Sequence, residues 1–300
     1  MVAVDMSGWL ETYRGTVSRW EVDHNDHLTV AYYFARIADA GLGVLEASGL
    51  GAEYAARGRR ACVTADCYVR YSRELRVGDI LHIESGVIDV EAADLVLGHK
   101  VFNSETGEVC TTVEQRVGHV ERAGRAAVPL TGAQRRVAEA RRVPWDGPPR
   151  ERRPRPRALD GFLDSARDTV KPWELDVLGQ SALPFYIHRF SAANGHAIAA
   201  FGMTPAYMRA ERRGFSTFEF QLALGAPLAP GDPVRVRSAV LHVGRSSMRL
   251  LHVMTNERGG ERVATLEQLG VHLDMDARRP TPLPDALREK AGAILVPVGD

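Results

Sequence analysis

The feature of this sequence that most constrains its fold is an internal repeat. When the chain is shifted so that Trp20 lies on Trp173, residues from about 17 to 138 align with a second copy without a gap. The segment WEVD at Trp20 meets WELD, and TVEQRVGH at Thr112 meets TLEQLGVH at Thr265. Roughly a quarter of the aligned positions are identical, against about one in fifteen expected from ordinary composition. Such a repeat is far too long for a solenoid unit, so the chain is a duplication of a whole domain.

The repeat also predicts where the domains begin and end. We expect an N-terminal domain over residues 1–138, a linker over 139–160 and a C-terminal domain over 161–300. The linker reads EARRVPWDGPPRERRPRPRALD, and its density of proline and arginine is typical of an extended, solvated segment. A basic strip that docks an acidic partner is the alternative interpretation.

Composition excludes several classes of protein. The chain has 38 Lys and Arg against 38 Asp and Glu, a balance that argues against a general nucleic-acid binder. Its cysteines, Cys62, Cys67 and Cys110, are odd in number and form neither a zinc spacing nor a disulfide framework. No signal peptide and no apolar run long enough for a transmembrane helix is visible. We therefore expect a soluble, metal-free globular protein of the reducing cytoplasm that binds neither nucleic acid nor membrane.

Within the first copy, hydrophobic periodicity predicts one short strand, one long helix, then four antiparallel strands and a short helix. The predicted strands are 13–22, 62–72, 80–90, 95–103 and 109–120, and the predicted helices are 28–49 and 131–141. A long helix wrapped by a curved sheet buries the apolar surfaces of both.

The polar run DHNDH at 23–27, just before the long helix, is the candidate chemical site. We expect unpaired backbone N–H groups at the start of the helix, which could stabilise a developing oxyanion. Asp23 suits a nucleophile or a general base toward water, Asn25 could orient that water or a carbonyl, and His27 could hydrogen-bond either. Helix capping alone also selects such residues.

The second copy provides an internal control for this choice. There the aligned run is DVLGQ at 176–180, which keeps the aspartate but replaces the first histidine and the asparagine with apolar residues and His27 with Gln180. The long helix persists, with Tyr186 aligned on Tyr33. The fold therefore does not require the polar set, and we interpret that set as chemical.

These residues together resemble the hotdog-fold thioesterases. The motif D-x-N-x-H of Asp23, Asn25 and His27 carries the resemblance, with a tyrosine ten residues after the aspartate and an L-x-x-G-D turn at 75–79. The resemblance covers most of each copy and implies an α+β double hotdog, in which each copy wraps a curved antiparallel sheet around a long central helix. Tandem copies in one chain resemble plant-type acyl-ACP thioesterases. The motif is similar to that of bacterial acyl-CoA thioesterases, including those of carnitine breakdown.

The resemblance implies hydrolysis of an acyl thioester of coenzyme A or acyl carrier protein, without a cofactor. Asp23 would be the catalytic carboxylate, with Asn25 and His27 in support. It also implies sites between paired domains, so the degenerate second copy would be the built-in partner of the active first copy, with further homo-oligomers open. Two positions depart from the family pattern: Asp26 replaces a glycine and Thr29 an asparagine. An aspartate there adds negative charge near a developing oxyanion unless its side chain points away.

Substrate contacts are expected from Tyr33 and from the strand after the long helix. Cys62 or Thr64 could face the site, but Cys62 and Val63 cannot both do so, because neighbours on a strand point to opposite faces. A buried cysteine without an activating neighbour is usually inert. His99 aligns with a histidine in the second copy and is therefore expected to be structural.

Two alternative functions remain open from the sequence. A hydratase or dehydratase acting on acyl thioesters could use the same aspartate and histidine. A non-catalytic module that binds acyl-CoA or an acyl carrier is the other, because Asp26 and Thr29 depart from the family pattern.

Overall fold

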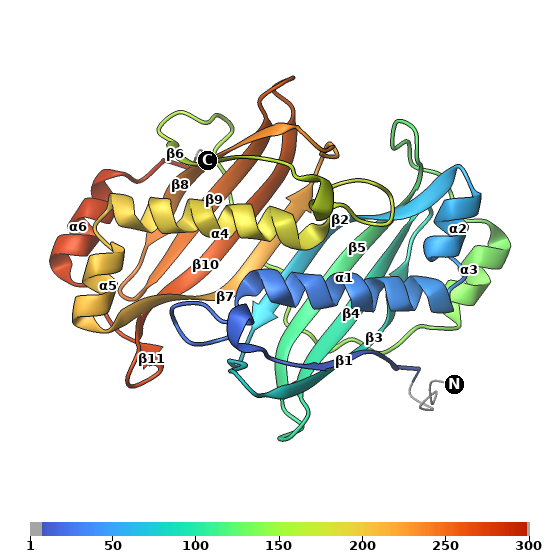
Figure 1. The fold of residues 1–300 in the computed structure, drawn as a ribbon, viewed down its shortest axis with the longest axis horizontal. Helices are drawn as coiled ribbons and strands as arrows, with labels where there is room; N and C mark the ends of the chain where they lie inside the picture. Colours follow the sequence, from blue (N-terminus) through green and yellow to red (C-terminus); the bar gives the residue numbers. More distant parts are fainter. Residues whose placement is uncertain (1–7, 299–300) are drawn as a thin grey trace. The chain divides into compact units, whose positions relative to one another are not determined.

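A computed structural model describes residues 8–298. The chain forms two compact units, with the boundary between Pro149 and Arg150. Each unit is a hotdog, in which a long helix lies on an antiparallel sheet (Figure 1).

The first unit contains a sheet in the order β1-β3-β4-β5-β2, with antiparallel pairing throughout. Its strands are β1 (Leu10–Thr16), β2 (Arg60–Tyr71), β3 (Ile80–Val90), β4 (Asp94–Asn103) and β5 (Val109–Glu121). Its helices are α1 (Val30–Ala47), α2 (Ala52–Arg57) and α3 (Gly132–Glu139), with a 3-10 turn at Arg19–Glu21. The long helix and the last four strands confirm the predictions, and β3 has the predicted bounds.

Two predicted bounds were wrong, and one short helix was not predicted. The first strand ends at Thr16, because the chain turns into the 3-10 turn instead of continuing to Val22. The long helix begins at Val30 and not at residue 28, because Leu28 forms a β-bridge with Val22. Helix α2 was not predicted, since six residues are too few to show a helical period.

Helix α1 is held on the sheet by one apolar face. Its buried residues recur at helical spacing and include Phe34, Ile37, Val44 and Leu45. Val44 and Leu45 belong to a core cluster with β3, β4 and β5 residues such as Val87, Leu97 and Val117. The helix ends where Gly49 takes a left-handed conformation, with φ of 70°.

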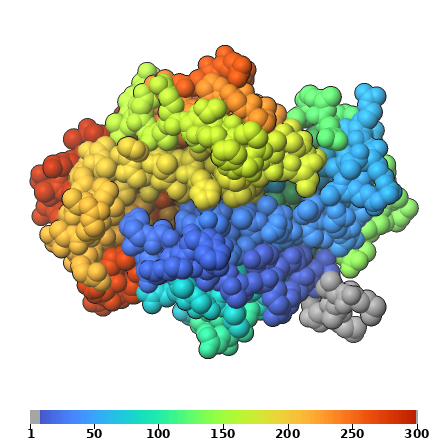
Figure 2. Space-filling model, in the orientation of Figure 1, coloured from blue at the N-terminus to red at the C-terminus, as the bar shows by residue number. Residues whose placement is uncertain are grey.

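The second unit repeats the arrangement with a sheet in the order β7-β10-β9-β8-β6. Its strands are β6 (Leu163–Thr169), β7 (Arg213–Leu224), β8 (Pro233–Val243), β9 (Ser247–Asn256) and β10 (Arg262–Asp274), with a short β11 (Arg279–Pro280) beside β10. Its helices are α4 (Leu183–Ala200), α5 (Pro205–Glu211) and α6 (Asp285–Ala293), with a 3-10 turn at Pro172–Glu174. In the space-filling view, α1 (blue) and α4 (yellow) lie on the visible surface of their own units (Figure 2).

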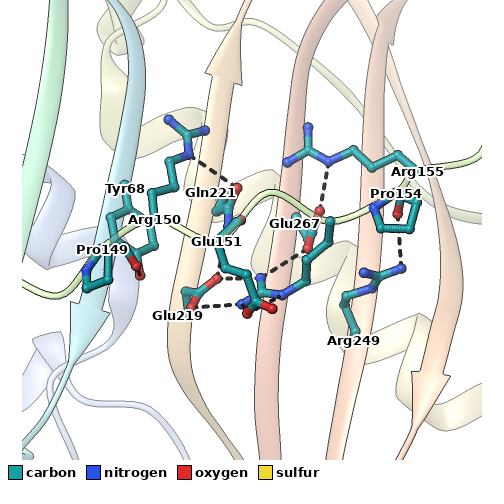
Figure 3. A network of polar contacts seen from close by, with 11 residues as sticks. Tyr68, Pro149, Arg150, Glu151, Pro154, Arg155, Glu219, Gln221, Arg249 and Glu267 are labelled. Atoms are coloured by element: carbon teal, nitrogen blue, oxygen red, sulfur yellow. Dashed lines mark hydrogen bonds and ion pairs between the residues drawn. The ribbon is translucent and has the colours of Figure 1, made fainter.

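Residues 144–155, which we call the strap, have no helix or strand but are not simply solvated. In the first unit, Trp145 donates a hydrogen bond to Glu114 (2.9 Å) and lies close to Gly98, where a Cβ atom would come within 2.8 Å of its ring. In the second unit, the Arg153 side chain is only 13% exposed and forms ion pairs with the buried Glu219 and Glu267 (Figure 3). The strap has no buried residue, as expected of a linker, but each half also contacts the sheet of its own unit.

Candidate functional site

The polar run lies in a closed loop of residues 22–28, the site loop, that precedes α1. An isolated β-bridge joins Val22 to Leu28, and the Asp23 N–H donates to the His27 carbonyl (3.1 Å). The Asn25 N–H donates to Asp23 Oδ1 (2.8 Å), which fixes the carboxylate within its own turn. The N-cap of α1 is Thr29, outside the polar run. Helix capping therefore does not explain the polar run.

His27 lies between two carboxylates. Its Nε2 is 3.4 Å from Asp23 Oδ2, and its Nδ1 is 3.3 Å from Glu74 Oε1. Both ring nitrogens can donate only when the imidazole is protonated, so the arrangement suits an imidazolium. The sequence does not predict Glu74, which lies in the turn between β2 and β3. The Leu28 N–H donates to the Leu75 carbonyl (2.7 Å) and so holds this turn against the site loop.

The positive charge of His27 and the negative charges of the two carboxylates stabilise each other. Burial alone would lower the pKa of His27, but hydrogen bonds with Asp23 and Glu74 and their charges raise it to about 9. Burial alone would raise the pKa of Asp23, but the His27 hydrogen bond and charge and the Asn25 N–H lower it below its usual value. At neutral pH the group therefore contains an imidazolium and an ionised Asp23.

Access to solvent separates the members of the group. The Asp23 side chain is 29% exposed and that of His27 14%, whereas Asn25 is only 1% exposed. The Asn25 amide lies 3.5 Å from Asp23 Oδ2. Asp23 and Glu74, whose side chains are each 29% exposed, are thus the accessible members, whereas Asn25 and His27 lie on the buried side.

Asp26 has a conformational role that explains its departure from the family glycine. Its φ is 58°, in the left-handed region, and the aligned residue of the second unit is Gly179, with φ of 76°. Aspartate tolerates this region better than most residues. The Asp26 carboxylate pairs with the exposed Arg19 (3.0 Å), which partly compensates its charge.

The second unit keeps the loop but not the ionic group. Asp176 Oδ1 accepts hydrogen bonds from the N–H groups of Leu178 (2.8 Å) and Gln180 (3.1 Å). Gln180 stands where His27 is in the first unit, and Pro227 stands where Glu74 is. The histidine and its second carboxylate are therefore absent together, a joint loss that could have revealed Glu74 from the sequence alone.

The structure does not bring Tyr33, Cys62 or Thr64 into this polar group. Tyr33, on α1, is 4% exposed, and its ring meets that of Tyr71 edge to face with the ring centroids 5.2 Å apart. Burial raises its pKa above the usual value. Cys62 packs beside the apolar cluster of β3, β4 and β5, and burial raises the pKa of its thiol to about 12, as expected of an inert cysteine. A substrate contact by any of the three stays a prediction.

Thr64 instead begins a chain of hydrogen bonds that crosses the sheet. Thr64 accepts a hydrogen bond from Gln115 (2.8 Å), and Gln115 Oε1 lies 3.0 Å from His99 Nε2. His99 Nδ1 lies 2.7 Å from the Ser85 hydroxyl, which in turn lies 2.7 Å from the Thr12 hydroxyl. The second unit has the same chain, formed by Thr217, Gln268, His252, Ser238 and Ser165. Burial lowers the pKa of His99 and of His252 to about 4, so both are neutral links. Because both units contain this series of hydrogen bonds, we infer that its role is structural.

Comparison with known proteins identifies the family. The sequence matches the family described as the thioesterase-like superfamily over residues 17–142 and 170–291. The chain belongs to this superfamily. The two matched stretches correspond to the two copies, so the duplication is of a thioesterase-like domain.

Individual relatives in this superfamily are distant. The L-carnitine dehydrogenase/betainyl-CoA thioesterase of Agrobacterium fabrum is 29% identical over 139 residues, which are 46% of this chain but only 28% of that protein. An acyl-ACP thioesterase from Bacteroides thetaiotaomicron matches with a TM-score of 0.66 and 14% identity, over 86% of this chain and 96% of that one. A 12:0-ACP thioesterase from Umbellularia californica has the same score and identity, over 90% and 93%. At these identities the two structures show the shared double-hotdog fold.

Neither a metal cluster nor a membrane-spanning helix is found among the described residues. Within residues 8–298, no group of three or more His, Cys, Asp or Glu side chains is arranged to hold a metal ion. None of the helices in that part of the chain has the length and apolarity needed to cross a membrane.

Proposed function

We propose that this chain hydrolyses acyl thioesters of coenzyme A or acyl carrier protein, and that the first unit carries the active site. The observation that supports this most strongly is the partly exposed, ionised Asp23, held by His27 on one side and by its own loop on the other. Membership of the thioesterase-like superfamily supports the reaction type.

In this proposal Asp23 is the catalytic residue. An ionised carboxylate can remove a proton from water as the water attacks the thioester carbonyl, or it can attack the carbonyl itself. In the first case the carboxylate takes the proton and the thiolate leaves. In the second a mixed anhydride forms, which water then cleaves. After a single turnover in ¹⁸O-water, label in the Asp23 carboxyl group would identify the anhydride route, because general-base attack by water places label only in the released acid.

His27 and Asn25 are positioning residues in this mechanism. Both ring nitrogens of His27 are directed to carboxylates, Asp23 and Glu74, so the imidazolium orients Asp23 and stabilises its charge. The 1% exposed Asn25 supports the loop from within. General-base catalysis of this kind typically contributes about 10²- to 10⁴-fold in rate.

The relatives favour thioesters but leave the acyl group open. The Agrobacterium relative is named for betainyl-CoA, and the two matched structures are named for acyl-ACP substrates. A panel of short, branched, aromatic and cationic acyl-CoA compounds, with acyl-ACP beside it, is therefore the appropriate first screen. Release of free thiol, followed with a thiol reagent, distinguishes hydrolysis from hydration or dehydration.

The two copies provide a matched pair of variants. Asp23→Asn should reduce thioester hydrolysis by at least about 100-fold, since the base or nucleophile is lost. Asp176→Asn, at the aligned position, should leave most of the activity, because the second unit lacks the histidine and the second carboxylate. Equal losses from both variants would contradict the one-site assignment. Tight thioester binding without turnover in the wild type would identify a binding module instead.

A further inference from the structure

The first unit has a pocket that is separate from the site loop. Its volume is about 650 Å³, and it is lined by Tyr54, Gly58, Arg59, Arg60 and Glu121. The site loop precedes α1, whereas this pocket includes residues of α2, which follows α1 in the chain. The 18 residues of α1 give a helix about 27 Å long, so the two features belong to opposite ends of it.

Most polar side chains of this pocket form hydrogen bonds with neighbouring residues. The Tyr54 hydroxyl lies 2.7 Å from His119 Nε2 and accepts a hydrogen bond from Gln134 (3.3 Å). Arg60 donates to Glu121 (3.3 Å). Arg59 differs: its side chain is exposed, and none of residues 8–298 forms a described ion pair or hydrogen bond with its guanidinium.

The second unit has the same scaffold with its arginine engaged. Tyr207, aligned with Tyr54, lies 3.1 Å from His272, and Arg213 donates to Asp274 (3.0 Å). Arg212, which aligns with Arg59, donates from Nε to both carboxylate oxygens of Asp276, at 2.9 and 3.1 Å.

Two substitutions between the copies account for the difference. Ala123 stands where the second unit has Asp276, and Gly58 stands where it has Glu211. The first unit therefore lacks two carboxylates around an otherwise repeated pair of arginines. With Glu121 counted, the pocket is left with an excess of positive charge, whereas the matching group of the second unit has an excess of negative charge.

We infer that this pocket binds the phosphate group of a small phosphorylated ligand, with Arg59 as its principal contact and Arg60 beside it. A guanidinium group presents paired N–H donors in a plane that matches phosphate oxygens, and Arg59 has these donors free to do so. The ligand is either the nucleotide end of coenzyme A or a separate phosphate compound. The inference does not depend on hydrolysis at Asp23, because binding is measured directly.

Binding to the full-length protein tests the inference. Isothermal titration with coenzyme A and with inorganic phosphate should show binding in the wild type, at least about tenfold weaker in Arg59→Ala. Ala123→Asp should weaken it similarly, because the new carboxylate would engage Arg59 as Asp276 engages Arg212. Arg212→Ala is the matched control and should stay within about twofold of the wild type. Thermal unfolding confirms that each variant is folded.

Kinetics then separate the two sources of the phosphate. If coenzyme A is the source, Arg59→Ala raises the KM for acyl-CoA about tenfold, with kcat and the KM for acyl-pantetheine, which lacks the nucleotide, unchanged. If a separate compound is the source, the loss of phosphate binding is not accompanied by a change in the KM for acyl-CoA. Either result supports phosphate binding by this pocket. Absence of binding to both probes at millimolar concentration, or equal affinity in wild type and Arg59→Ala, would overturn it.

Discussion

At the scale of single residues, the candidate site depends on how His27 divides its two N–H groups between Asp23 and Glu74. Neither carboxylate alone requires a protonated ring, because a neutral imidazole can donate from one nitrogen only. The second carboxylate is what favours the imidazolium. The proposed nucleophile or base thus owes part of its charge stabilisation to Glu74, a residue 51 positions away in the chain (74 − 23).

Glu74→Gln should lower the pKa of His27 from about 9 toward its usual value. If the imidazolium is needed, the alkaline fall in turnover should move to lower pH by the same amount. NMR titration of the His27 ring and the pH profile of kcat measure the two shifts. Glu53→Gln, which removes an exposed carboxylate paired with Arg57, is the control. A uniform loss of activity with no change in the pKa would assign Glu74 a packing role only.

The same pKa has a consequence for stability. Because the pKa of His27 is higher in the folded chain than its usual 6.5, its contribution to the free energy of unfolding is fully present below pH 6.5. That contribution is lost as the pH rises through about 9. The lowered pKa of Asp23 acts at the other end, since its contribution disappears as the pH falls through that pKa.

At the scale of elements, the turn geometry of the site loop is shared by the two units and the chemistry is not. Both loops place a left-handed residue at the same point, Asp26 in one and Gly179 in the other. Both also precede an 18-residue helix. A buried ion pair fixes each helix to the 3-10 turn before the loop: Arg36 with Glu21 in the first unit and, in the second, Arg189 with Glu174.

Asp26→Gly should change the free energy of unfolding by less than about 1 kcal/mol, because glycine adopts the left-handed conformation freely and the exposed pair with Arg19 contributes little. Asp26→Val should destabilise by about 1–3 kcal/mol, since a β-branched residue is strained there. Urea unfolding measures both. We expect kcat of Asp26→Gly to stay within about twofold of the wild type. A large increase would mean that the Asp26 charge opposes the oxyanion.

The sequence predicts elements far better than it predicts contacts. The repeat and the hydrophobic period locate α1 and the strands because burial imposes those patterns on every copy. The site loop is predicted from its composition, but its closure by the bridge from Val22 to Leu28 is not, since two residues provide no period. Glu74 is missed because its partner His27 is distant in the chain, and only the comparison with Pro227 reveals it.

At the scale of the whole molecule, duplication allows the two copies to specialise. The first copy keeps the ionic group at Asp23 and an open pocket at Arg59, whereas the second has Asp176 without a histidine and Arg212 bound to Asp276. What the copies share is structural: the hydrogen-bond chain through His99 or His252 and the buried ion pair at the start of the long helix.

The strap joins the two units, and its ion pairs predict an effect on stability. Arg153 pairs with Glu219 and Glu267, which are 1% and 2% exposed. Removing one partner of a buried ionic group leaves uncompensated charge and costs about 3–5 kcal/mol. Arg153→Ala should therefore destabilise the second unit by an amount of this order, reduced to the extent that Arg155, which also pairs with Glu267 (2.7 Å), compensates.

Differential scanning calorimetry and urea unfolding of the full-length chain measure this loss. Arg152→Ala, which removes an exposed neighbouring arginine, should change the stability by less than about 0.5 kcal/mol. Adding Glu219→Gln to Arg153→Ala should recover part of the loss, because a neutral amide is less costly to bury than an unpaired carboxylate. If Arg153→Ala is no more destabilising than Arg152→Ala, the network in Figure 3 does not contribute to the stability of the second unit.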